Sequence, residues 1–141
     1  MKPIIILVRG VANTGKTCTI LNFFKKSGKS LPKGLKEIKG EIVTIDGIVF
    51  GIRTKGDPGS EKETEEVLND FIADGSVQVI ICASRTFGET LETVYRFYYN
   101  GKVDFVHLLE PFEYEERANW SKTKLKKLEK TVERVRELHN L

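Results

Sequence analysis

The chain has 141 residues, of which 40% are hydrophobic and 30% are charged, and its formal net charge is +3. This length and composition predict one globular domain over residues 1–141 with a core of its own, and they exclude a chain that is disordered throughout. No apolar run approaches the ~18 residues of a membrane span, and the mild positive charge does not require a nucleic-acid partner.

Cysteine usage and the first residues favour a cytoplasmic protein. Cys18 and Cys82 belong to no C-x-x-C pair, so the sequence favours free thiols over a zinc site or a disulfide framework. The apolar stretch at residues 4–8 is too short for the hydrophobic region of a signal peptide. We therefore expect a cytoplasmic location.

The first predicted element is a buried strand at residues 4–8, because its uninterrupted apolar run is typical of a parallel strand covered on both faces. The segment RGVANTGKTCTI at residues 9–20 follows, and a helix over about residues 17–27 comes next. The segment fits the pattern G-x-x-x-x-G-K-[ST]. Glycines in such a loop let several backbone N–H groups point at one anion, and the start of the helix adds its dipole.

This segment resembles the Walker A element of the P-loop NTPase superfamily. The resemblance implies binding of ATP or GTP with Mg²⁺, and it does not fix the reaction. Lys16 is expected to reach the β- and γ-phosphates, and Thr17 to offer its hydroxyl to Mg²⁺. The residues expected to bind the nucleotide are Gly10, Asn13, Thr14, Gly15, Lys16, Thr17 and Cys18. The alternative interpretation is a glycine-rich turn without a ligand.

A lysine-rich loop at residues 25–40 leads to two apolar runs, residues 41–45 and 48–53. Asp46-Gly47 between them indicates a two-residue hairpin turn, so the two strands are expected to be antiparallel. The lysines of the loop could bind nucleic acid, but no aromatic residue lies between Lys25 and Lys39 to stack on bases, and we favour a solvated loop.

The second half of the chain alternates helices and strands. Ser60 and Glu63 form a predicted capping box for a helix that Gly75 ends. A buried strand at residues 77–84, a helix at 87–100 with Thr86 as its N-cap and Tyr98 on its core face, and a strand at 103–109 follow. In the last helix, from about residue 121, an apolar stripe lies opposite a row of basic residues that includes Lys124, which is typical of a surface helix.

This order of elements predicts a three-layer α/β/α sandwich with a mostly parallel five-stranded sheet and one antiparallel hairpin at residues 41–53. The P-loop NTPase resemblance implies the same architecture. In that superfamily an acid at the end of a neighbouring strand usually helps to hold Mg²⁺. No strand of this sequence ends in such an acid.

Asp46 and Asp57 are the two candidates for the missing acid. If the strand at 48–53 runs parallel to the first strand, its carboxyl end lies beside the phosphates and Asp46 lies at the opposite end, as a turn residue. Asp57, in TKGDPGS, lies on the correct side and is our candidate for the second Mg²⁺-holding group. Its other interpretation is ordinary Asp-Pro-Gly turn chemistry.

The segment SRTFGET at residues 84–90 is expected at the same edge of the sheet. Arg85 could neutralise phosphate charge in a transition state, whereas Glu89 could orient a water or sit passively in a first helical turn. GIRTKGDPGS and VIICASRTFGET are similar to segments of small bacterial P-loop proteins with generic ATP-binding or ATPase labels. That resemblance adds no substrate, but it supports a site that includes Asp57, Ser84 and Arg85.

We expect a Mg-ATP-binding NTPase, either a small phosphotransferase or an ATPase, with Lys16, Asp57 and Arg85 in catalytic roles and an unknown acceptor or protein partner. The absence of an N-K-x-D motif, which reads guanine, favours ATP over GTP. A nucleotide-dependent switch with weak hydrolysis and a nucleic-acid-associated ATPase remain the alternatives.

Overall fold

The computed structural model describes residues 2–11, 14–31, 36–55, 59–86, 88–114 and 122–141. The described elements follow one another as β1 (Ile4–Arg9), α1 (Lys16–Phe24), the short 3₁₀ helix η1 (Lys25–Ser27), β2 (Glu41–Ile45), β3 (Ile48–Arg53), α2 (Glu61–Asp74), β4 (Val79–Ser84), α3 (Glu89–Tyr99), β5 (Phe105–Leu108) and α4 (Lys122–Leu138).

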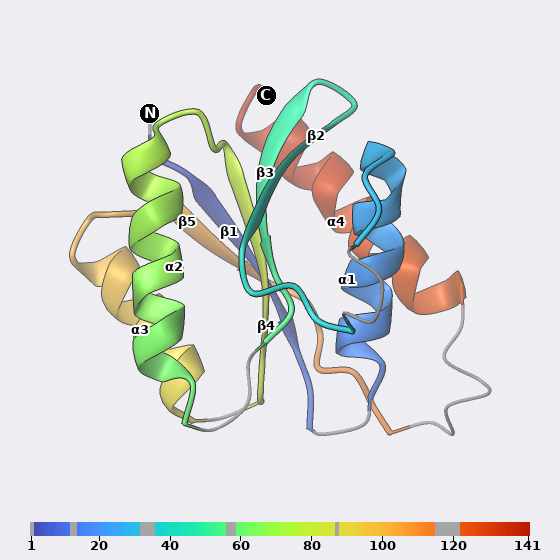
Figure 1. Cartoon of the computed structure of the whole chain (residues 1–141), viewed down its shortest axis with the longest axis horizontal. Helices are drawn as coiled ribbons and strands as arrows, with labels where there is room; N and C mark the ends of the chain where they lie inside the picture. Colours follow the sequence, from blue (N-terminus) through green and yellow to red (C-terminus); the bar gives the residue numbers. More distant parts are fainter. Residues whose placement is uncertain (1, 12–13, 32–35, 56–58, 87, 115–121) are drawn as a thin grey trace.

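The strands form one mixed sheet in the order β2-β3-β4-β1-β5 (Figure 1). β3, β4, β1 and β5 are parallel, and β2 is antiparallel to β3. The predicted α/β class and the hairpin at residues 41–53 are confirmed. Asp46 and Gly47 both have positive φ, 51° and 81°, as a two-residue turn of type I′ requires.

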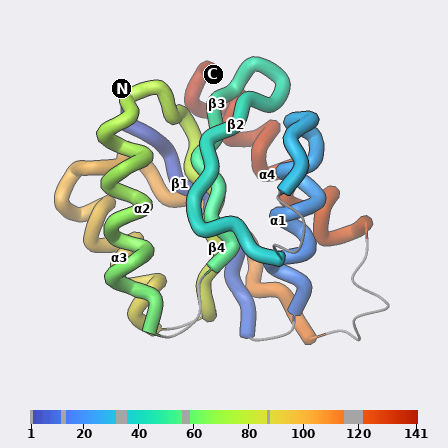
Figure 2. Tube along the Cα trace, viewed as in Figure 1, coloured from blue at the N-terminus to red at the C-terminus, as the bar shows by residue number. Residues whose placement is uncertain are grey.

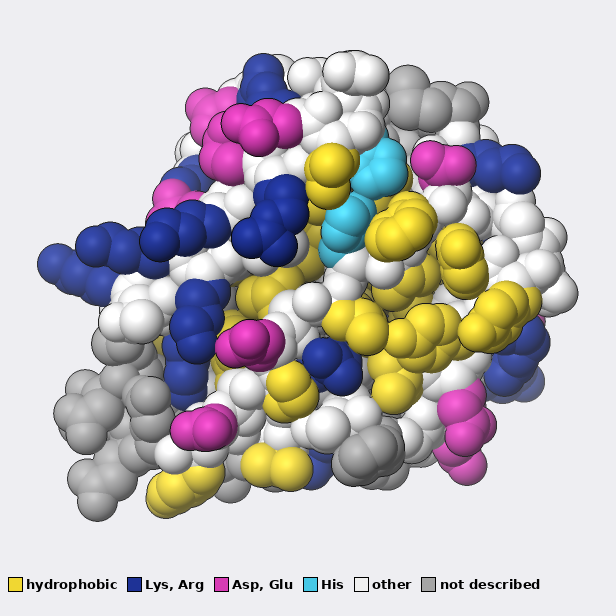
Figure 3. Space-filling model, turned by 180° about the vertical axis from the view of Figure 1, so that it is seen from behind, with side chains coloured by type: hydrophobic (Ala, Val, Ile, Leu, Met, Phe, Trp, Pro, Cys, Tyr) yellow, Lys and Arg dark blue, Asp and Glu magenta, His cyan; other side chains and the backbone are white. Residues whose placement is uncertain are grey.

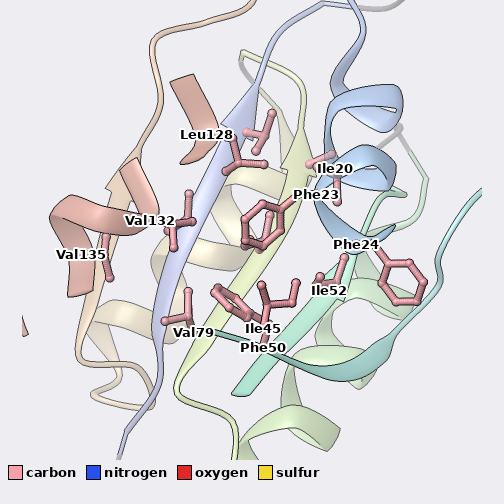
Figure 4. Packing of buried hydrophobic residues seen from close by; sticks show 14 of the residues in the cluster. Ile20, Phe23, Phe24, Ile45, Phe50, Ile52, Val79, Leu128, Val132 and Val135 are labelled. Atoms are coloured by element: carbon pink, nitrogen blue, oxygen red, sulfur yellow. The ribbon is translucent and has the colours of Figure 1, made fainter. Parts of the chain in front are cut away.

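Two helices cover each face of the sheet, as the traces in Figures 1 and 2 show. Side chains alternate between the faces of a strand, so one set of β1 residues packs under α1 and α4 and the next set under α2 and α3. Figure 4 shows the first of these cores, where Phe23 of α1 meets Phe50 of β3 edge to face, with ring centroids 5.2 Å apart. Both faces of β1 and β4 are therefore buried, which explains their unbroken apolar sequences.

The start of α2 differs from its prediction. Ser60 is the N-cap but makes no side-chain cap hydrogen bond. The Glu63 carboxylate instead accepts a hydrogen bond from the fully buried guanidinium of Arg53 at 3.1 Å. This hydrogen bond and the positive charges of Arg53, Lys55 and Lys39 hold the pKa of Glu63 below its ordinary value. Pairing a buried cation outweighs the modest gain of a capping box.

The start of α3 also differs from its prediction. α3 begins at Glu89 with Gly88 as N-cap, so Thr86 does not cap it. Gly88 has φ 121° and ψ −169°, a conformation that favours glycine. Within α3 the core face includes Phe97, while Tyr98, which we expected there, is exposed.

Gly51 lets α2 approach β3 closely, and this contact generates a stability prediction. A Cβ at Gly51 would lie 2.8–2.9 Å from three ring atoms of Phe71. We expect Gly51→Ala to lower the free energy of unfolding by about 1–3 kcal/mol in urea titrations, because the ring cannot move away freely. In a Phe71→Leu background the cost of Gly51→Ala should shrink, and an unchanged cost would show that the ring is not the obstacle.

Candidate functional site

The site lies where the carboxyl ends of β1 and β4 meet. Arg9 of β1 is in register with Ser84 of β4, and the N–H of Gly10 donates to the Ser84 carbonyl at 3.2 Å. The helices that follow these two strands, α1 and α3, cover opposite faces of the sheet (Figure 1). This position is the topological switch point, at which open α/β sheets bind their ligands.

Two glycines shape the loop between β1 and α1. A Cβ at Gly10 would lie 2.7 Å from Thr14 Oγ1 and 3.0 Å from the carbonyl oxygen of Phe112, so only glycine fits without a shift. Gly15 caps α1 with φ 85°, in the left-handed region. Thr14 is buried and its hydroxyl donates to the carbonyl of Val11 at 3.0 Å. Asn13, predicted to bind the nucleotide, lies outside the described residues.

Lys16, the first residue of α1, joins the loop to β4. Its Nζ donates to the carbonyl oxygen of Gly10 at 2.6 Å and to that of Ser84 at 3.1 Å. The ammonium therefore lies between the ends of two neighbouring strands. Thr17 and Cys18 follow in the first turn of α1 and are half-buried. The thiol of Cys18 accepts a weak hydrogen bond from Asn22, one turn further along the helix.

Lys124 of α4 is a site residue that the sequence analysis missed. It is only 6% exposed, and its Nζ donates to the carbonyls of Thr14 at 2.7 Å and Glu113 at 3.2 Å. The same ammonium lies 5.3 Å from the ring centroid of Phe112. The charge of Lys124 predicts a position on the solvent side of the helix. Its position four residues before Leu128, on the apolar stripe, was the signal that it points inward.

Phe112 and Lys124 both contact the loop from the side of β5. The N–H of Phe112 donates to the carbonyl of Arg9 at 2.8 Å, and Phe112 forms an isolated parallel bridge with Gly10. Segments distant in the sequence therefore fix the loop on two sides. Ser84 and Lys16 hold it from β4, and Phe112 and Lys124 hold it from β5 and α4.

The predicted location of the Mg²⁺-holding acid is partly corrected. β3 is parallel to β1, as we assumed, and Asp46 lies in the turn at the other end of the sheet. However, β4 lies between β3 and β1, so the carboxyl end of β3 is two strand spacings, about 9.5 Å, from β1 rather than beside it. Asp57 itself lies outside the described residues.

The carboxyl groups of Glu61 and Glu89 influence each other at this edge of the sheet. Glu61 opens α2 and Glu89 opens α3, and each helix follows a parallel strand. The pKa of Glu89 is raised by its hydrogen bond to Glu61 and by the Glu61 charge, whereas the pKa of Glu61 is lowered by backbone and side-chain hydrogen bonds. Glu61 was not singled out from the sequence, because a glutamate in a first helical turn is common.

The start of the SRTFGET segment lies beside the loop. Ser84 is buried, its carbonyl accepts the hydrogen bonds from Lys16 and Gly10, and its hydroxyl donates to the carbonyl of Arg85 at 2.8 Å. Arg85 follows directly after the end of β4. Its catalytic role stays a prediction, as does that of Glu89.

Comparison of the chain with protein-family models, with curated proteins and with solved structures gives no match. Among the described residues, no group of three or more His, Cys, Asp or Glu side chains is placed to hold a metal ion. None of the helices in the described ranges is both long and apolar enough to cross a membrane.

Lys124 generates a prediction of stability. Lys124→Met keeps the length of the side chain but leaves the carbonyls of Thr14 and Glu113 without this donor, so the free energy of unfolding should fall by about 1–3 kcal/mol in urea titrations. Lys126→Met, on the exposed side of α4, is the matched control and should change it by less than ~0.5 kcal/mol. Equal effects of the two variants would contradict the role of Lys124 in holding the loop.

The carboxyl pair generates a prediction of pH dependence. Because the pKa of Glu89 is raised, this group stabilises the fold at low pH, and that stability is lost as pH rises through the pKa of Glu89. Because the pKa of Glu61 is lowered, the stability that Glu61 contributes is lost as pH falls through the pKa of Glu61. In Glu61→Gln, carboxyl ¹³C NMR titration should show the pKa of Glu89 falling towards its ordinary value. The charge of Glu92 makes the smallest contribution to the raised pKa of Glu89, so Glu92→Gln should lower that pKa less than Glu61→Gln does. A larger shift in Glu92→Gln would refute the pairing.

Proposed function

We propose that the chain binds Mg-ATP in the loop between β1 and α1 and cleaves its γ-phosphoryl group, as a P-loop NTPase that transfers the group to water or to a second substrate. The observation that supports this best is the position of Lys16. Its ammonium lies at the switch point of the sheet, within a glycine loop that opens a helix. Sheet topology and loop sequence thus indicate the same position independently.

The loop offers the donors that a triphosphate needs. Lys16 donates to two neutral carbonyl oxygens, and phosphate oxygens would compete for the ammonium because charge-assisted hydrogen bonds are about twice as strong as neutral ones. The N–H groups in the first turn of α1, which precede the hydrogen bonds within the helix, add further donors and a favourable dipole. Arg85, at the end of β4, would add positive charge where negative charge develops during transfer.

The residues at this edge fit a magnesium ion. Thr17 would supply a hydroxyl, and Asp57 or the Glu61–Glu89 pair would supply carboxylates, which are the oxygen ligands that Mg²⁺ prefers. The ion would supply positive charge that neutralises the phosphate oxygens. Glu89 would accept a hydrogen bond from the attacking water or hydroxyl group, and the hydrogen bond to Glu61 and the Glu61 charge, which raise the pKa of Glu89, make its carboxylate the more basic of the two.

A nucleotide-dependent switch with weak hydrolysis is the second candidate function. It is favoured by the strand ends, because β3 ends in Arg53 before Thr54 and β4 ends in Ser84 before Arg85, with no carboxylate at either position. A phosphate-release assay with Mg-ATP and a panel of acceptors separates the two. Turnover faster than about once per minute supports the enzyme, and tight binding without turnover supports the switch.

Lys16→Ala is the direct test of nucleotide binding. Loss of its charge-assisted hydrogen bonds should weaken Mg-ATP binding on the order of 100-fold in isothermal titration calorimetry. Lys25→Ala, an exposed lysine just after the other end of α1, should leave the affinity unchanged. The proposal fails if Lys16→Ala binds Mg-ATP as tightly as the unmodified chain does.

The predicted Mg²⁺-holding acid is tested by two matched variants. Asp57→Asn should raise the Mg²⁺ concentration needed for half-maximal ATP binding, because it removes a charged ligand. Asp46→Asn makes the same chemical change at the opposite end of the sheet and should have no effect. If Asp57→Asn has no effect and Glu61→Gln has the expected one, the acid is Glu61. Equal effects of the two aspartate variants would refute the assignment to Asp57.

A further inference from the structure

The outer edge of β5 presents backbone groups that could pair with another strand. β5 is the last strand of the sheet and pairs with β1 alone among the described strands. The N–H of Leu109 donates to the carbonyl of Leu7 at 3.1 Å, so the backbone groups of the alternate residues Val106 and Leu108 face away from β1. Such a row of N–H and C=O groups is a template for an extended chain.

The side chains of β5 do not block this edge. β5 contains no lysine or proline, the residues that commonly protect an edge strand, and Phe105 and Leu108 are 43% and 40% exposed. Figure 3 shows this face of the molecule. The two histidines lie between a run of hydrophobic side chains on one side and lysine and arginine side chains on the other.

α4 places a row of positive charge beside the same edge. Lys127, Lys130 and Arg134, spaced i, i+3 and i+7, line one wall of a groove of about 240 Å³. The other wall consists of Leu108, Leu109 and Glu110 at the end of β5, so three cations face one carboxylate.

The charges on the two sides of α4 differ in their pairing. Within the described part of the chain, none of the three groove cations forms an ion pair. On the opposite side of the helix, Glu129 pairs with Lys26 and Arg136 donates to the carbonyl of Asp46 at 2.9 Å. Counting only residues that the structure describes, positive charge is therefore in excess on the side that faces the open strand edge.

We propose that this groove is a docking site for an extended acidic segment of a partner protein. The segment adds a strand to β5 and directs alternate carboxylates at α4. Same-face residues of a strand are about 6.7 Å apart, and the steps from Lys127 to Lys130 and on to Arg134 are about 4.5 and 6 Å along the helix. The long, flexible side chains of the lysines and the arginine make up the difference between these two spacings.

The other occupants of such an edge fit less well. A second copy that paired β5 with β5 would bring two identical rows of positive charge together, which is unfavourable. A single-stranded nucleic acid would pair its phosphates with the cations, but it offers no regular row of N–H and C=O groups to the strand edge. The acidic extended peptide satisfies both the charges and the backbone.

The test is fluorescence anisotropy with the full chain and a fluorescein-labelled peptide of nine residues, glutamate alternating with valine and threonine. Lys127→Glu/Lys130→Glu should weaken binding at least about tenfold. Lys122→Glu/Lys126→Glu makes the same charge change at exposed positions of α4 that do not line the groove, and it should weaken binding less than about twofold. Circular dichroism checks that both variants are folded.

A second peptide separates strand pairing from simple charge attraction. The same sequence N-methylated along both edges keeps its carboxylates and cannot pair as a strand, so it should bind at least about tenfold more weakly. Lys16→Ala should bind the acidic peptide normally, which makes this result independent of the nucleotide proposal.

Four results would overturn the docking site. They are no binding of the acidic peptide, equal effects of the two double variants, unchanged affinity of the N-methylated peptide, and tighter binding of an oligothymidylate of equal charge. A dimer in sedimentation equilibrium that Lys127→Glu/Lys130→Glu strengthens would assign the edge to a second copy instead.

Discussion

The parallel pairing of β1 with β4 is the constraint on which the candidate site depends. Six residues of each strand are in register, from Ile4 with Val79 to Arg9 with Ser84. This register brings the end of β4 to the beginning of the glycine loop, where the Ser84 carbonyl accepts hydrogen bonds from Gly10 and Lys16. Because a slip of one residue would turn every side chain to the other face, the two buried cores keep the site aligned.

The rest of the chain supports this junction from the other side. The segment after β5 runs along Gly10 through Phe112, and the buried Lys124 connects α4 to both that segment and the loop. A displacement of α4 would therefore move the loop directly through Lys124, without a displacement of the sheet. The groove between β5 and α4 shares α4 with this arrangement, so a docked segment and the loop contact the same helix.

Much of this architecture follows from local sequence, and the parts that do not have physical causes. Asp46-Gly47 predicted the hairpin because few residues accept two successive positive φ angles. The loop is recognisable in the sequence because its glycines and Lys16 occur at fixed spacing between a strand and a helix. The strand order could not be predicted, since β3 and β4 are both apolar and either could lie beside β1. This ambiguity is why the end of β3 was expected next to the phosphates.

The misjudged polar residues share one cause, which is that long-range partners override local preference. Glu63 pairs with buried Arg53 rather than with the helix end, and Lys124 lies inside because two carbonyls distant in sequence accept its hydrogens. Thr86 is a good capping residue by type, but the turn before α3 places Gly88 at that position.

The most direct measurement is an amide ¹H–¹⁵N NMR titration of the isotope-labelled chain with Mg-ATP. The account predicts that the largest shifts occur at Gly15, Lys16 and Thr17 and at Ser84 and Arg85, the two strand ends that Lys16 joins. Largest shifts in the β5–α4 groove, or none at saturating Mg-ATP, would contradict it.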